Sequence, residues 1–88
     1  MEEKIVYATT YIKSSKNRFN LVGILENGMK TPSEIANLTN LRLSQISFLL
    51  KGLKTEKIVE CINENAKRGR LYKLTDLGKK TVQFIEEN

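Results

Sequence analysis

The amino-acid sequence predicts a mainly α-helical domain with one small β-hairpin. Apolar residues recur at helix spacing through residues 1–56 and again through 76–88. Near residue 40, a short segment with a helix-capping pattern runs directly into a longer helical segment. Two short apolar runs, separated by the polar and basic stretch NENAKRG, fill residues 58–75. With 88 residues, the chain is short enough for a single domain, 1–88.

The first segment, residues 1–14, is expected to form a helix. Ile5, Ala8 and Ile12 share one helical face, and the two glutamates at its start suit the positive end of a helix dipole. The β-branched residues of this segment leave a strand open as the alternative.

A second helix is expected after the two serines that follow this segment. Phe19, Leu21, Val22 and Leu25 fall at helix spacing and should form its apolar face. Gly28 is a natural stop, because glycine adopts the left-handed conformation that often ends a helix.

The stretch KTPSEIANLTN has a complete helix-start pattern. Thr31 is the expected N-cap, Pro32 occupies the first helical position, and Glu34 follows three residues after the cap, which together form a capping box. The helix that begins here should be short, because polar residues soon interrupt it. Together with the next helix it makes a helix-turn-helix over residues 31–56.

The second helix of this pair, residues 42–56, is predicted to have two different faces. At about 100° per residue, one face gathers apolar side chains into an arc. The opposite face has polar, basic and aromatic residues but no acid. The apolar face consists of Ile46, Leu49, Leu50 and Leu53, and the other of Ser44, Ser47, Phe48, Lys51 and Lys54.

The segment 58–75 is predicted to form a hairpin with a basic tip. Residues 58–62 and 71–74 are the two expected strands. Thr75 then caps a terminal helix over residues 76–88. Placed after a helix-turn-helix, such a hairpin is called a wing, and the order of elements is that of a winged helix-turn-helix domain.

Several chemistries are excluded by composition. The chain has no histidine and one cysteine, so neither a Cys/His zinc site nor a His-dependent triad can be assembled from it. No nucleophile–base pair, carboxylate pair or phosphate-binding glycine loop can be identified, so we expect no enzyme activity, cofactor or metal. Cys61 lies in an apolar stretch and is expected to be a small buried core residue rather than a reactive thiol.

The charge is concentrated in the middle of the chain. Residues 16–75 contain eleven lysines and arginines and five glutamates, which give this segment a net charge of +6. The whole chain has a net charge of +5, so its two ends together are slightly acidic. Such a distribution favours a polyanionic partner. No apolar run approaches the roughly 18–20 residues that span a bilayer. The acids at the start of the chain do not fit a signal peptide, so a cytoplasmic protein is expected.

Residues 31–80, TPSEIANLTNLRLSQISFLLKGLKTEKIVECINENAKRGRLYKLTDLGKK, resemble the small archaeal and bacterial winged-helix transcriptional regulators, the class of the MarR-like and ArsR-like repressors. The resemblance covers about residues 16–80. The chain lacks the Cys/His clusters of ArsR-like metal sensors, so metal sensing is not implied. It has little room for the effector pocket that MarR-like regulators place between extra helices.

The resemblance implies a sequence-specific regulator that binds double-stranded DNA with the helix 42–56 in the major groove. Residues at the start of the helix would read bases, and residues nearer its end would contact phosphates. The wing would lie on phosphates or in the minor groove. Each feature also has an explanation without DNA binding. The helix face could lack acids by chance, and the basic wing tip could be an ordinary solvent-exposed turn. The implied DNA-binding residues are Arg42, Ser44, Gln45, Ser47 and Phe48 for bases, Lys51 and Lys54 for phosphates, Lys67, Arg68 and Arg70 in the wing, and Thr31 and Ser33 at the short helix.

One such module covers a short site, so a homodimer is expected. The apolar residues of the segments 1–14 and 76–88 would either form the dimer interface or complete the core of the monomer. Because fold does not fix the partner, a winged-helix module that binds protein or RNA is the alternative function.

Overall fold

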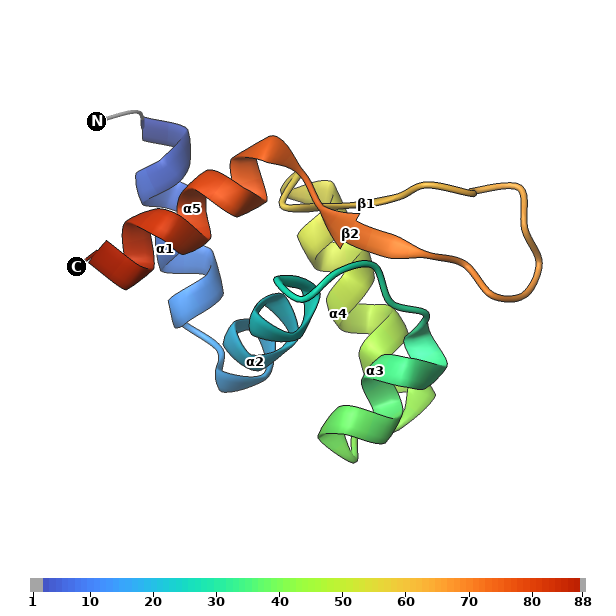
Figure 1. Ribbon diagram of the computed structural model, residues 1–88. Coiled ribbons are helices and arrows are strands. Elements are labelled where there is room, and N and C mark those ends of the chain that lie inside the picture. The colour runs from blue at the N-terminus through green and yellow to red at the C-terminus, as the bar shows by residue number, and fades with distance from the viewer. Residues whose placement is uncertain (1–2, 88) are drawn as a thin grey trace.

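The computed structural model describes residues 3–87 and has the winged helix-turn-helix fold (Figure 1). Residues 1, 2 and 88, which the predicted terminal helices include, lie outside the described residues. In chain order, the elements are α1 (Glu3–Lys13), α2 (Lys16–Leu25), α3 (Pro32–Thr39), α4 (Leu43–Thr55), β1 (Val59–Cys61), β2 (Tyr72–Leu74) and α5 (Asp76–Glu87).

The two terminal helices complete the core of the monomer. The described part of residues 1–14 is helix α1, not a strand, and it packs against α5. Ile5, Ala8 and Ile12 are buried from α1, and Val82 is buried from α5. These side chains therefore belong to the core of the monomer. Only the outer faces of the two helices are left for contacts with another molecule.

The core continues through α2, α3 and α4. From these helices Leu21, Ile35, Ile46 and Leu53 are fully buried in one apolar cluster. Phe19, which the sequence placed on the apolar face of α2, is 47% exposed and therefore only partly covered. It lines a small pocket beside the core residues Ile12 and Val22.

The predicted capping box is present at the start of α3. Thr31 Oγ1 accepts a hydrogen bond from the Glu34 amide at 3.2 Å, and Glu34 Oε1 accepts one from the Thr31 amide at 2.8 Å. These hydrogen bonds hold the pKa of the Glu34 carboxyl below its ordinary value. At its other end α3 stops at Asn40, whose left-handed backbone (φ 62°) opens the turn into α4.

The wing strands pair antiparallel, with Val59 opposite Leu74 and Cys61 opposite Tyr72. An additional rung, not predicted from the sequence, joins Lys30 to Tyr72 through two backbone hydrogen bonds of 3.1 and 2.9 Å. The connection between α2 and α3 is thereby tied to the root of the wing. Cys61 is only partly buried, which corrects the prediction of a core residue, because it lies at the end of β1 where the wing leaves the core.

The start of α5 is fixed to the root of the wing. As predicted, Thr75 caps the helix, because its Oγ1 accepts a hydrogen bond from the Gly78 amide at 3.0 Å. The same hydroxyl donates to the Lys57 carbonyl at 2.6 Å. None of the helices within residues 3–87 has the length and apolar character needed to cross a membrane.

Candidate nucleic-acid interface

Helix α4 has the two faces that the sequence predicted. Ile46, Leu50 and Leu53 are buried, whereas Phe48 is 76% exposed. No acid occurs between Glu34 and Glu56, so this outer face has basic and neutral side chains only. The predicted DNA-binding residues on and beside α4 are all exposed: Arg42, Ser44, Gln45, Ser47, Phe48, Lys51 and Lys54.

Gln45 has a structural role that spacing alone did not indicate. Its Oε1 accepts a hydrogen bond from the backbone amide of Arg42 at 3.0 Å, which caps the start of α4. Bidentate recognition of adenine needs both the oxygen and the nitrogen of the Gln side chain. Gln45 can therefore donate from Nε2 while its Oε1 caps the helix.

Two apolar side chains interrupt the polar surface of α4. Phe48 and Leu43 are 76% and 53% exposed, and neither belongs to the apolar core formed by the described residues 3–87. An aromatic ring held out from the middle of this helix has the size and apolarity to contact the methyl group of thymine.

An ion pair joins α4 to the wing. The ammonium group of Lys54 contacts the carboxylate of Glu64, and both side chains are about half exposed. This contact raises the pKa of Lys54 and lowers the pKa of Glu64. Lys54, which the resemblance assigned to phosphate, thus already has an acidic partner, and Glu64 is an acid close to the proposed DNA face.

The wing loop is organised by Asn63, a residue that sequence reasoning treated only as a loop former. Its Oδ1 accepts a hydrogen bond from the Leu71 amide at 2.8 Å, and its Nδ2 donates to the Gly69 carbonyl at 3.2 Å. Arg70 Nε donates to the Ala66 carbonyl at 2.8 Å, so part of this guanidinium is used inside the loop. Gly69 allows the turn through its positive φ of 65°.

The remaining predicted residues fall into two groups. Lys67 and Arg68 are exposed at the tip of the wing. Ser33 is exposed at the start of α3, but the hydroxyl of Thr31 is occupied by the capping box. The carboxylate of Glu34 also lies at this helix start, where it would oppose a phosphate, so the α3 contact is the weakest of the set.

Figure 1 shows the arrangement of these elements. Helices α3 and α4 pack together at one end of the molecule. The wing extends outward as an arm from the end of α4 that leads into β1. Among the described residues 3–87, the ion pair between Lys54 and Glu64 links a predicted DNA-binding residue of α4 to the wing loop.

Comparisons with known proteins identify the fold. No model of a known protein family matches the chain, and no curated protein matches it significantly in sequence. TubR of Bacillus thuringiensis serovar israelensis, solved bound to 24 bp of tubC, is 17% identical, with a TM-score of 0.78 over 94% of this chain and 92% of that chain. The transcriptional repressor BigR from Xylella fastidiosa is 23% identical, with a TM-score of 0.78 over 93% and 80%.

A third similar structure is a mutant MarR from E. coli complexed with operator DNA. It is 22% identical, with a TM-score of 0.77 over 96% of this chain and 61% of that chain. The chain therefore spans about three fifths of MarR and most of TubR and BigR. At such identities the likeness establishes the winged-helix fold.

Proposed function

We propose that this chain is a transcriptional regulator that binds double-stranded DNA sequence-specifically. The main support is the outer face of α4, which is exposed, contains Lys51 and no acid, and belongs to the second helix of a helix-turn-helix. An acid-free face is what a phosphate backbone requires, since carboxylates would be repelled. Two proteins of the same fold, TubR and MarR, were solved with DNA.

In this proposal the residues have different tasks. Arg42, Ser44, Ser47 and Phe48 read base edges in the major groove, with Gln45 as a single donor. Lys51, Lys67 and Arg68 neutralise phosphates or enter the minor groove. Lys54 and Arg70 act chiefly inside the protein, by fixing the position and the shape of the wing, because each already has a partner there.

The binding should depend strongly on salt. If Lys51, Lys67 and Arg68 each neutralise about one phosphate, the logarithm of the binding constant should fall with the logarithm of salt concentration with a slope near −3 per domain. Fluorescence anisotropy with a mixed-sequence duplex, between about 50 and 200 mM salt, measures this slope. Absence of binding at the lowest salt, or equal or tighter binding to RNA of the same sequence, would contradict the proposal.

We further propose that the regulator is a homodimer joined through the outer face of α1. The inner face of this helix is used by the monomer core, but Tyr7 is 71% exposed and Val6 is 47% exposed on the other side. A second copy could bury both while placing two α4 helices about 34 Å apart, on successive turns of the major groove.

Sedimentation velocity tests the dimer. The wild-type chain should sediment at about twice its mass of 10.1 kDa, and Tyr7→Glu should return it to one copy. Phe19→Glu, which also places an acid at an exposed aromatic position, is the control and should leave the mass unchanged. A wild-type chain that stays at 10.1 kDa at micromolar concentrations and on DNA would exclude the dimer.

A further inference from the structure

A pocket lies on a part of the molecule that the proposed DNA-binding residues do not line. It has a volume of about 410 Å³ and is bounded by α2, the connection that follows it, β2 and α5. Leu25, Leu74 and Val82 form its apolar floor. None of the residues assigned above to DNA lines this pocket, so its chemistry calls for a separate explanation.

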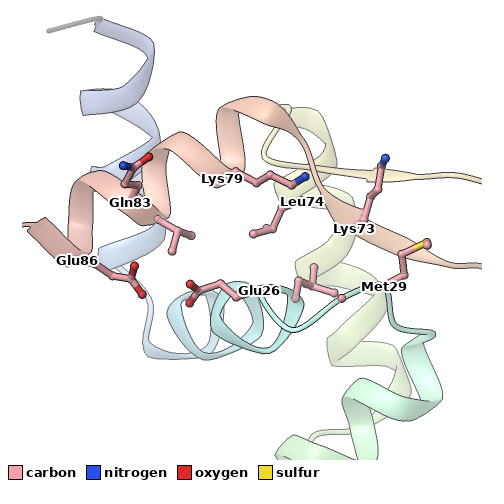
Figure 2. Close-up of a pocket in the computed structure, with 10 residues that line it drawn as sticks. Glu26, Met29, Lys73, Leu74, Lys79, Gln83 and Glu86 are labelled. Carbon is pink, nitrogen blue, oxygen red and sulfur yellow. The ribbon is translucent and has the colours of Figure 1, made fainter.

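The charges of the pocket are separated into two ends. Figure 2 shows the carboxylates of Glu26 and Glu86 pointing toward each other at one end. Lys73 and Lys79 lie toward the other end, at β2 and the start of α5. The apolar floor lies between the two groups. The pocket therefore has a negative end, an apolar middle and a positive end.

The negative end lacks a cation. Within residues 3–87, no Lys or Arg is within ion-pair distance of Glu26 or Glu86. Some loss of hydration, the charge of Glu86 and a side-chain hydrogen bond with Glu86 together raise the pKa of Glu26 above its ordinary value. A hydrogen bond between two carboxyl groups needs a proton on one of them, and an ammonium group that contacts both could replace that proton and neutralise the charge.

We propose that this pocket binds a small zwitterion, a molecule with an ammonium group and a carboxylate joined by a short apolar chain. The ammonium group contacts Glu26 and Glu86, the apolar chain covers Leu74 and Val82, and the carboxylate reaches Lys73 or Lys79. The site does not depend on the proposed DNA binding. It also differs from a pocket between extra helices, because every wall comes from the winged-helix domain itself.

The probe is ε-aminocaproate, which has these three parts. Caproate and hexylamine, each with one of its charges, are the ligand controls. In amide nuclear magnetic resonance spectra of the DNA-free protein, ε-aminocaproate should give saturable shifts centred on Leu74, Val82 and Gln83. A molecule of this size is expected to bind with a dissociation constant in the millimolar range. Each control should bind at least about fivefold more weakly, since it loses one charged contact of about 1 kcal/mol or more.

Variants separate the pocket from general charge effects. Glu86→Gln and Lys79→Met should each weaken binding of ε-aminocaproate at least fivefold by removing about 1 kcal/mol of charged contact. Glu3→Gln and Lys80→Met, which change exposed charges of α1 and α5 outside the pocket lining, should leave it unchanged. Absence of saturable shifts, equal binding of the three probes, or equal effects of the two pairs of variants would each overturn the proposal. Because no DNA is present, these results do not depend on whether the chain binds DNA.

Discussion

The double substitution Lys51→Glu with Arg68→Glu is expected to weaken binding to a mixed-sequence duplex by about two orders of magnitude near 50 mM salt. Each phosphate contact adds about 0.9 to the salt slope through counterion release, so losing two should flatten the slope by nearly 2. Both residues are exposed, one on α4 and one at the wing tip, so the fold should be unaffected. Anisotropy titrations of both proteins over the same salt series measure the affinity and the slope.

The matched control is Lys16→Glu with Lys80→Glu. It changes the net charge by the same amount but places the acids on the exposed sides of α2 and α5, away from the proposed dimer interface. It should reduce affinity only slightly, because charges more than a Debye length of about 10 Å from the DNA are screened. If the two double variants bind equally well, the α4 face and the wing are not the DNA-binding surface, and the proposed function is wrong.

The fold could be predicted largely because its signals are local. The capping box of α3 lies within four consecutive residues, Thr31 to Glu34, and the faces of α4 follow from helix periodicity alone. The rung between Lys30 and Tyr72 could not be predicted, since it joins residues far apart in sequence through backbone atoms, which leave no pattern in the side chains. The partial exposure of Phe19 has a related reason: periodicity shows which residues share a face but not how completely their neighbours cover them.

The exposure of the candidate DNA-binding residues could be predicted from the sequence, but the contacts that some of them make inside the protein could not. The basic wing tip and the acid-free face are visible in the sequence. The contact of Lys54 with Glu64 depends on how the wing lies against α4, and the bond from Arg70 to Ala66 depends on the turn at Gly69. The pocket of Figure 2 could not be predicted from the sequence, because its walls come from two stretches of the chain, residues 25–29 and 73–86, that are far apart in sequence.

Gly78 is the glycine at which an added methyl group is expected to destabilise the protein most. A side chain there would meet the backbone carbonyl of Ile58 at less than van der Waals distance, and also the side chain of Leu74. The carbonyl cannot move freely, because it accepts hydrogen bonds from Thr75 N at 3.0 Å and Thr75 Oγ1 at 3.1 Å. This contact holds the start of α5 against the root of the wing, so α5 must move away or the Thr75 cap must break.

Gly78→Ala is therefore expected to lower the free energy of unfolding by about 2–3 kcal/mol, as overpacking against fixed neighbours does. For a domain of this size, that corresponds to a fall in Tm of roughly 10–20 °C. Gly23→Ala is the control: a methyl group in the middle of α2 meets nothing within 4 Å, so higher helix propensity should stabilise the protein by about 0.5–1 kcal/mol. Thermal unfolding followed by circular dichroism measures both. Equal stabilisation by the two alanines would mean that α5 does not lie against Ile58, and that the wing is not anchored through this contact.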